Sequence, residues 1–235
     1  MSEKILEIRS LSGWYKKGSN VLSELSFDLN KNEIVGLIGL NGAGKTTLIK
    51  ILSGLLDSCN AESVCYDGKP ANFRDNKFKN QRYTVFSEDS SFGYFTFREY
   101  LSYVFSAYGK KCPDVTELVQ GFHFEEYEHK LLKDLSMGNR RKVNLITAFA
   151  LKAPLLFLDE PVNGLDFQST EFLYSLISGY KEHGTLLFSS HILESITLTS
   201  DRVMVLENGS ISHTFTDDEI TAESVRKVLR LDNVI

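Results

Sequence analysis

The stretch "GLNGAGKTT", Gly39 to Thr47, decides the fold of this 235-residue chain. It satisfies the phosphate-binding pattern G-x-x-x-x-G-K-[ST] in full. It follows "EIVGLIG", Glu33 to Gly39, a continuous apolar run typical of a strand buried on both faces. It opens "KTTLIKILSGLL", in which apolar residues recur at helical spacing. A plain glycine-rich turn is the alternative, but the order of strand, glycine turn and helix favours a phosphate loop.

The residue types within this stretch suit a nucleotide. The glycines let backbone N–H groups turn toward phosphate oxygens, and the helix N-terminus adds a favourable potential. We expect Lys45 to reach the β- and γ-phosphates and Thr46 to ligate Mg²⁺. The predicted nucleotide contacts of the loop are Gly39, Asn41, Gly42, Ala43, Gly44, Lys45, Thr46 and Thr47.

A second motif, "LLFLDE" at Leu155 to Glu160, places two carboxylates after four apolar residues. At the carboxyl edge of a parallel sheet, Asp159 would hold Mg²⁺, directly or through water, and Glu160 would polarise the attacking water. Strands often end in acidic residues that have no such role. Combination with the phosphate loop favours the metal and catalytic roles.

A third apolar run, "TLLFSSH", ends in His191. A lone histidine is usually structural or solvated. This one follows the next predicted strand, so it falls on the same sheet edge as Glu160, where it would contact a γ-phosphate.

The rest of the chain predicts one domain with a mainly parallel α/β sheet. Two alternating runs near the N-terminus indicate antiparallel strands, and Asn208-Gly209 indicates a hairpin. The segment from Asn76 to Asp134 reads as a mostly helical insertion. We expect a single domain over 1–235, with the nucleotide-binding core and antiparallel part in about 1–75 and 151–215, a helical subdomain in about 76–150, and a C-terminal tail in 216–235.

Composition excludes several classes of protein. With 42% hydrophobic and 24% charged residues the chain is globular, and a net charge of −5 without a dense Lys/Arg block argues against a nucleic-acid partner. Cys59, Cys65 and Cys112 are too few and too irregularly spaced for a disulfide framework or a zinc site. We expect neither a signal peptide nor a membrane-spanning run of about 18 apolar residues.

The stretch "LSMGNRRKV", Leu135 to Val143, has two interpretations. It is a good amphipathic helix start with Ser136 as N-cap. It also suits half of a binding site for a phosphate, because a helix start has unpaired N–H groups that attract anions.

With the phosphate loop, the acidic motif and the histidine in this order, the sequence resembles the ATPase subunit of an ABC transporter from about Ile5 to Phe215. The resemblance implies an α/β fold: a P-loop NTPase (RecA-like) core with a mainly parallel sheet, a small N-terminal antiparallel β subdomain and an inserted α-helical subdomain. It implies ATP and Mg²⁺ as ligands. It implies ATP hydrolysis by Glu160, His191 and Lys45.

The resemblance also assigns residues outside these motifs. Tyr15 in "GWYKKGSNVL" stands where the family stacks an aromatic ring on adenine, with Trp14 as the adjacent candidate. Asp166 in "PVNGLD" matches a position that in the family lies across a dimer interface. The family signature, LSGGQ, matches Leu135–Asn139 in part.

Ser136 and Gly138 are the signature residues that in the family touch a γ-phosphate bound by the opposing subunit. Met137 and Asn139 replace its other glycine and its glutamine. The segment "TFREYL", Thr96 to Leu101, resembles the one that follows the family's glutamine loop. Counting back from it, Ser87 or Glu88 stands where the family has a glutamine that helps to sense Mg²⁺.

The resemblance implies that two copies, or this chain and a paralogue, bind two ATP molecules head to tail, and of these we favour two copies. The partner is a separately encoded transmembrane permease subunit, as in bacterial two-component exporters. The chain would lie at the cytoplasmic face of the membrane, which it contacts only through this partner. Two alternatives stay open: a soluble ABC ATPase acting in translation or DNA maintenance, and a nucleotide-gated binding module without turnover.

Overall fold

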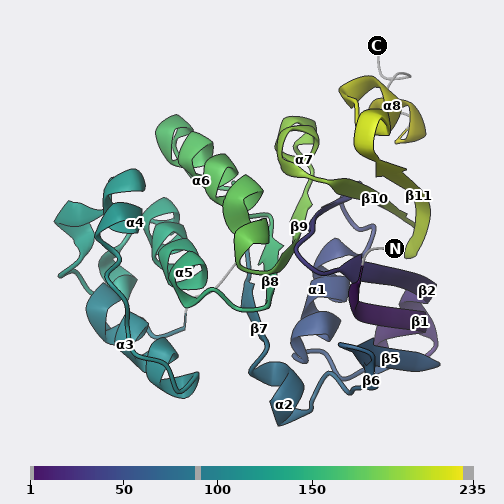
Figure 1. Cartoon of the computed structure of the whole chain (residues 1–235), viewed down its shortest axis with the longest axis horizontal. Coiled ribbons are helices and arrows are strands. Elements are labelled where there is room, and N and C mark those ends of the chain that lie inside the picture. The colour runs from purple at the N-terminus through teal and green to yellow at the C-terminus, as the bar shows by residue number, and fades with distance from the viewer. Residues whose placement is uncertain (1–2, 88–90, 230–235) are drawn as a thin grey trace.

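The computed structural model describes residues 3–87 and 91–229, which form two sheets and the helices that cover them (Figure 1). The smaller sheet is antiparallel and has the strand order β2-β1-β5-β6, with β4 paired to β1. Its strands are β1 (Lys4–Lys16), β2 (Ser19–Asn30), β4 (Cys59–Asn60), β5 (Ser63–Tyr66) and β6 (Lys69–Pro70).

The larger sheet has the order β11-β10-β3-β9-β8-β7 and is parallel apart from its edge strand β11. Because its parallel strands share one direction, their carboxyl ends meet at a single edge. The strands are β3 (Ile34–Ile38), β7 (Arg82–Val85), β8 (Leu155–Asp159), β9 (Thr185–Ser190), β10 (Arg202–Glu207) and β11 (Ser210–Thr216).

The central strands of this sheet are covered on both faces. In β8, Leu155 and Phe157 pack into the core that contains helix α1 (Lys45–Ser53) and the antiparallel sheet. Leu156 and Leu158 belong to the core beneath the remaining helices. This alternation follows from the two-residue period of a strand, and it explains why the strand sequences are continuous apolar runs.

Helix α1 lies between the two sheets. Helices α3 (Phe97–Ala107), α4 (Thr116–Gly121) and α5 (Met137–Leu151) gather at the end of the molecule opposite the antiparallel sheet (Figure 1). Local capping fixes several helix starts. Thr96 and Glu99 form a reciprocal capping box at α3, and Asp166 caps α6 through the backbone N–H of Ser169. Helix α6 spans Phe167–Gly179, and the remaining α-helices are α2 (Asn76–Lys79), α7 (Leu193–Thr199) and α8 (Ala222–Val228).

One strand lies in the segment that the sequence suggests to be helical. Strand β7 pairs in parallel with β8 and forms an edge of the larger sheet, so the stretch from Asn76 to Asp134 is not purely an insertion. The strand has four residues and one neighbouring strand. It therefore lacks the continuous apolar run that marks β3, β8 and β9.

Within the described residues, none of the helices combines the length and the apolar character needed to cross a membrane.

Candidate nucleotide site

The phosphate loop connects the end of β3 to the start of α1. Gly44 stands at the N-cap of α1 with φ +110°, and because it has no side chain, the first backbone N–H groups of the helix stay available to an anion. Gly42 also has a positive φ, +84°, at the exposed tip beside Asn41. These two glycines let the chain turn tightly without a Cβ penalty.

The tip of the β10–β11 hairpin supports the phosphate loop through a backbone hydrogen bond. The Gly209 N–H donates to the carbonyl of Ala43 at 3.2 Å, and the Ser23 N–H on β2 donates to the carbonyl of Gly209 at 3.0 Å. Close packing continues at Gly39, where a Cβ would stand 2.3 Å from the Leu206 carbonyl oxygen. The loop thus rests on a segment that lies 166 residues later in the sequence (209 − 43).

Lys45 and Thr46 face the two predicted carboxylates across the sheet edge. The Lys45 ammonium donates to the Gly39 carbonyl at 2.7 Å and lies 3.5 Å from Glu160 Oε1. The Thr46 hydroxyl lies 3.1 and 3.0 Å from the two carboxylate oxygens of Asp159. The structure therefore brings the loop and the acidic motif together.

Asp159 is fully buried at the end of β8. Besides Thr46, the hydroxyls of Ser189 and Ser87 donate to its carboxylate at 2.8 and 3.3 Å. Sequence reasoning does not single out Ser189. Ser87 is one of the two predicted candidates for the glutamine position, and Glu88, the other candidate, lies outside the described residues.

The Asp159 carboxylate and the Thr46 hydroxyl are hard oxygen donors of the kind that Mg²⁺ prefers. Within the described ranges there is no cluster of three or more His, Cys, Asp or Glu residues able to hold a metal. A cation at this edge therefore needs water and phosphate oxygens as further ligands, which is how Mg²⁺ is held in many nucleotide sites. The donor set fits Mg²⁺ bound together with a nucleotide.

Glu160 and His191 form a pair beside Lys45. His191 Nδ1 lies 2.7 Å from Glu160 Oε2, and the His191 backbone N–H donates to the same oxygen at 3.3 Å. The Glu160 side chain is mostly buried, at 12% exposure, while that of His191 is 50% exposed. Glu160 has φ +48°, a conformation that costs a non-glycine residue on the order of 1–3 kcal/mol and is concentrated at functional sites.

Tyr15 lies next to the phosphate-loop helix. Its hydroxyl is 3.5 Å from Thr47 Oγ1, and Lys50 Nζ stands 5.7 Å from its ring centre. The ring is 56% exposed, so a flat ligand has access to it. Trp14 is only partly exposed.

The signature residues form a second group, around the start of α5. Ser136 caps the helix by accepting from the Asn139 backbone N–H at 3.2 Å. Gly138 approaches Gly164 so closely that a Cβ on it would stand 2.3 Å from the Gly164 carbonyl oxygen. Met137 is 70% exposed beside them.

Asp166 binds within its own chain, to Lys142 of α5 at 2.7 Å. The Lys142 ammonium, helped by the Ser169 backbone N–H, holds the pKa of the Asp166 carboxyl well below its usual range. This ion pair ties α5 to the start of α6.

Arg141 is the main residue of the site that sequence reasoning misses. It is 4% exposed, and its guanidinium donates to the carbonyls of Phe86, Ser87 and Asp159 at 3.0, 2.5 and 3.3 Å. Burial lowers the pKa of this guanidinium, and the neighbouring Asp159 and Glu160 carboxylates oppose that effect. In the sequence it stands within a basic run that looks like a solvated helix face.

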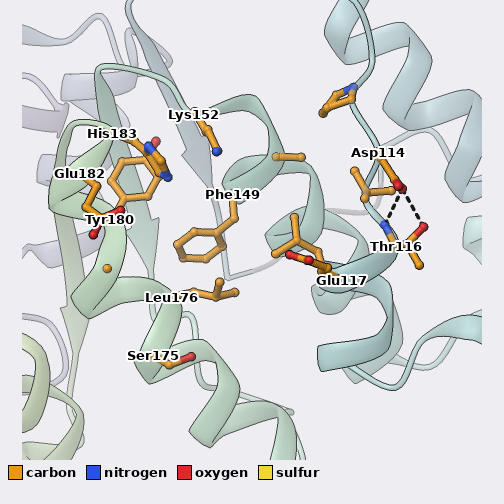
Figure 2. A pocket seen from close by; sticks show the side chains of 15 residues that line it. Asp114, Thr116, Glu117, Phe149, Lys152, Ser175, Leu176, Tyr180, Glu182 and His183 are labelled. Carbon is orange, nitrogen blue, oxygen red and sulfur yellow. Dashed lines mark hydrogen bonds between the residues drawn. The ribbon is translucent and has the colours of Figure 1, made fainter.

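A cleft of about 660 Å³ lies away from the phosphate loop, between the start of α4 and the ends of α5 and α6 (Figure 2). Figure 2 shows the rings of Phe149 and Tyr180 on one side and Glu117 with Thr116 on the other. It contains none of the predicted nucleotide contacts.

Comparison with known proteins agrees with this geometry. A family model described as ABC transporter matches residues 22–163. The chain is 37% identical to AlbC of Bacillus subtilis, named as an ABC transporter ATP-binding protein, over 88% of this chain and 90% of that protein. It is 31% identical to SkfE of Bacillus subtilis, the SkfA peptide export ATP-binding protein, over 97% of both.

A relative named for the opposite direction of transport is also found. The chain is 28% identical to PotA of Clostridium novyi, a spermidine/putrescine import ATP-binding protein, over all of this chain and 70% of that protein. A solved structure described as the ATP binding subunit of an ABC transporter superposes with a TM-score of 0.83 at 28% identity, covering 98% of this chain and 95% of that one.

Proposed function

Because this chain belongs to the ABC transporter family and matches its ATP-binding proteins over most of its length, we propose that it energises export through a separately encoded transmembrane subunit. It is an ATP-binding, ATP-hydrolysing subunit of an ABC transporter, as the sequence predicts. The α/β fold of a P-loop NTPase is likewise confirmed. We further propose the roles of individual residues, the binding of Mg²⁺, the dimer, the membrane partner and the direction of transport.

The convergence of Lys45, Thr46, Asp159 and Glu160 at one sheet edge carries the proposal for the site. Phosphoryl transfer depends mainly on positioning and charge neutralisation. Lys45 would hold the β- and γ-phosphates, and Glu160, 3.5 Å from its ammonium, would orient the attacking water. Mg²⁺ held by Thr46 and Asp159 would neutralise charge on the phosphates.

The residues around this centre complete the proposed site. His191 would contact the γ-phosphate beside Glu160, to which it is hydrogen-bonded. Tyr15 would stack on adenine, since its exposed ring borders the phosphate-loop helix.

The second group of residues, at the start of α5, suits a nucleotide held by another copy of the chain. Ser136 and Gly138 would contact the γ-phosphate on the partner, and Asp166 would lie at the same interface. Two ATP molecules would then bridge a head-to-tail dimer, and hydrolysis would remove the bridge. ATP favours the closed dimer only to the extent that it binds this state more tightly.

The proposed direction is export, supported by the peptide-export relative and by the resemblance to two-component exporters. The chain would lie at the cytoplasmic face of the membrane, through its partner. Reconstitution with a co-purifying membrane protein tests both points. Candidate peptides on the ATP side of the vesicle membrane should stimulate hydrolysis, whereas stimulation only from the opposite side would indicate import. Co-purification with ribosomes or DNA instead would favour the soluble alternative.

The variant Glu160→Gln tests the site directly. It should bind ATP but hydrolyse it about 100-fold or more slowly, because it cannot act as a base, and it should accumulate an ATP-dependent dimer on size exclusion. Lys45→Ala in the same background should lose ATP binding. Rapid turnover by Glu160→Gln would remove Glu160 from the catalytic role, and undiminished binding by Lys45→Ala would exclude the phosphate loop.

A further inference from the structure

Arg141 joins three separate segments of the site. It extends from α5, the helix whose start carries Ser136 and Gly138, to the loop after β7 and to the end of β8. Among the described residues it has three hydrogen-bond acceptors, and each is a backbone carbonyl. A guanidinium presents a rigid fork of donors, so it fixes the relative positions of these carbonyls better than a flexible ammonium would.

The arrangement around Asp159 gives this link a chemical consequence. The shortest of the three contacts, at 2.5 Å, is to the carbonyl of Ser87. The hydroxyl of the same serine donates to Asp159 Oδ2 at 3.3 Å. Arg141 therefore contacts the main chain on both sides of this hydrogen bond: the Ser87 carbonyl and the Asp159 carbonyl, which is 3.3 Å away.

The hydrogen bonds of Arg141 are strengthened by the burial of its side chain. Arg141 is 4% exposed, and water cannot replace the carbonyls as partners without opening the packing between α5 and β8. Removing the guanidinium would leave the buried Asp159 carbonyl and the partly buried Phe86 and Ser87 carbonyls without this donor, and it would free the loop that carries Ser87.

We propose that Arg141 is a positioning residue for the metal side of the nucleotide site. From the signature helix it holds the Ser87 main chain, so that the Ser87 hydroxyl stays on Asp159 and orients this carboxylate toward Mg²⁺. Ser87 thereby serves in this chain at one of the two positions where the resemblance predicts a glutamine. The inference rests on the proposed function, because it requires Mg²⁺ at Thr46 and Asp159.

Its first test measures Mg²⁺ dependence rather than turnover. A fluorescent ATP analogue is titrated onto the Glu160→Gln chain at a series of Mg²⁺ concentrations and in EDTA. Adding Arg141→Gln should raise the half-saturating Mg²⁺ concentration about tenfold or more, as loss of outer partners of a metal ligand does. Affinity for the analogue in EDTA should stay the same.

Arg140 supplies the matched control. It is the preceding residue of the same helix, but its guanidinium donates to the Leu132 and Lys133 carbonyls, away from Asp159. Arg140→Gln should leave the half-saturating Mg²⁺ concentration unchanged. Arg141→Lys should recover part of the loss, because an ammonium keeps the charge but cannot engage all three carbonyls.

A double-mutant cycle separates positioning from simple structural support. If Arg141 acts through Ser87, then Ser87→Ala should by itself raise the half-saturating Mg²⁺ concentration. In the double variant Ser87→Ala/Arg141→Gln, the total rise in this concentration should be smaller than the product of the two single-variant rises. Thermal unfolding of each variant identifies those that fail to fold. Should Arg141→Gln fail to fold, Ser87→Ala and Arg141→Lys carry the test.

An unchanged Mg²⁺ dependence in Ser87→Ala, or multiplicative effects in the double variant, would overturn the inference. Failure of the proposed function looks different. In that case the parent chain itself would bind the analogue weakly, or equally well with Mg²⁺ and in EDTA.

Discussion

At the scale of single residues, Ser136 combines two roles that use the same physics. It caps α5, and the N–H groups at this helix start are suited to a phosphate. Ser136→Arg should abolish ATP-driven dimerisation of the Glu160→Gln chain, since the bulky side chain would fill the space of the partner's γ-phosphate. ATP binding to the monomer should persist.

The substitution Ser136→Asp separates the cap from the phosphate contact. Aspartate is as good an N-cap as serine, so thermal stability should be kept, whereas its charge would repel a γ-phosphate. Both variants are examined by size exclusion and by nucleotide titration. If monomer binding and dimerisation fell equally, Ser136 would be a helix cap alone.

Asp166 gives a pH-dependent prediction. Its pKa is lowered in the folded state, chiefly by Lys142, so its contribution to stability is present above the unfolded pKa of about 3.9 and is lost as the pH falls through the lower folded value. The side chain is 55% exposed, which limits the ion pair to about 0.5 kcal/mol.

The two substitutions Asp166→Asn and Asp166→Ala should therefore differ. Asparagine keeps the N-cap of α6 and should cost about 0.5 kcal/mol at pH 7, while alanine also loses the cap and should cost about 1 kcal/mol more. Urea unfolding from pH 7 to pH 2 measures this. The deficit of Asp166→Asn should shrink below pH 4, and a deficit that grows there would contradict the assigned ion pair.

At the scale of elements, the start of α5 packs directly on the loop before α6. Gly138→Ala would push a Cβ to within 2.3 Å of the Gly164 carbonyl oxygen, so it should destabilise the chain by about 1–3 kcal/mol and weaken ATP-driven dimerisation. Gly179→Ala is the matched control. Gly179 ends α6 with φ −78°, and a Cβ there would meet nothing within 4 Å, so this change should stabilise by about 0.5 kcal/mol. Equal stabilities of the two variants would contradict this packing.

Whether the sequence predicts a strand depends on where the strand lies in the sheet. Strands β3, β8 and β9 are buried on both faces, so their apolar runs are visible without tertiary information. Strand β7 is an edge strand whose pattern, RYTV, depends on its one neighbour, β8. Propensity therefore could not separate it from the helices around it.

The residues of the nucleotide site likewise fall into those that the sequence predicts and those that only the fold reveals. Lys45, Thr46, Asp159 and Glu160 belong to local motifs whose spacing carries the chemistry. Arg141 and Ser189 have no such motif: their role at Asp159 arises from segments that only the folded sheet brings together. Burial of Arg141 could not be predicted from "NRRKV", because its acceptors are carbonyls, which any residue supplies.

At the scale of the whole molecule, nucleotide binding is coupled to stability. A non-hydrolysable ATP analogue with Mg²⁺, at about 100 times its dissociation constant, should stabilise the fold by about 2.7 kcal/mol. For a chain of this size the midpoint of thermal unfolding should rise by about 5–10 °C. Lys45→Ala should lose most of the rise, and a shift of equal size in this variant would place the analogue elsewhere.

The hairpin tip behind the phosphate loop has a consequence for biosynthesis. Ala43 emerges from the ribosome early, but its partner Gly209 is made 166 residues later (209 − 43), and β9 and β10, which flank β3, also come late. At about 5–20 residues per second this interval lasts about 8 to 33 s. During translation the nascent loop therefore has its full sequence well before it has its supports, and ATP should become a ligand only after the segment through the β10–β11 hairpin has been made.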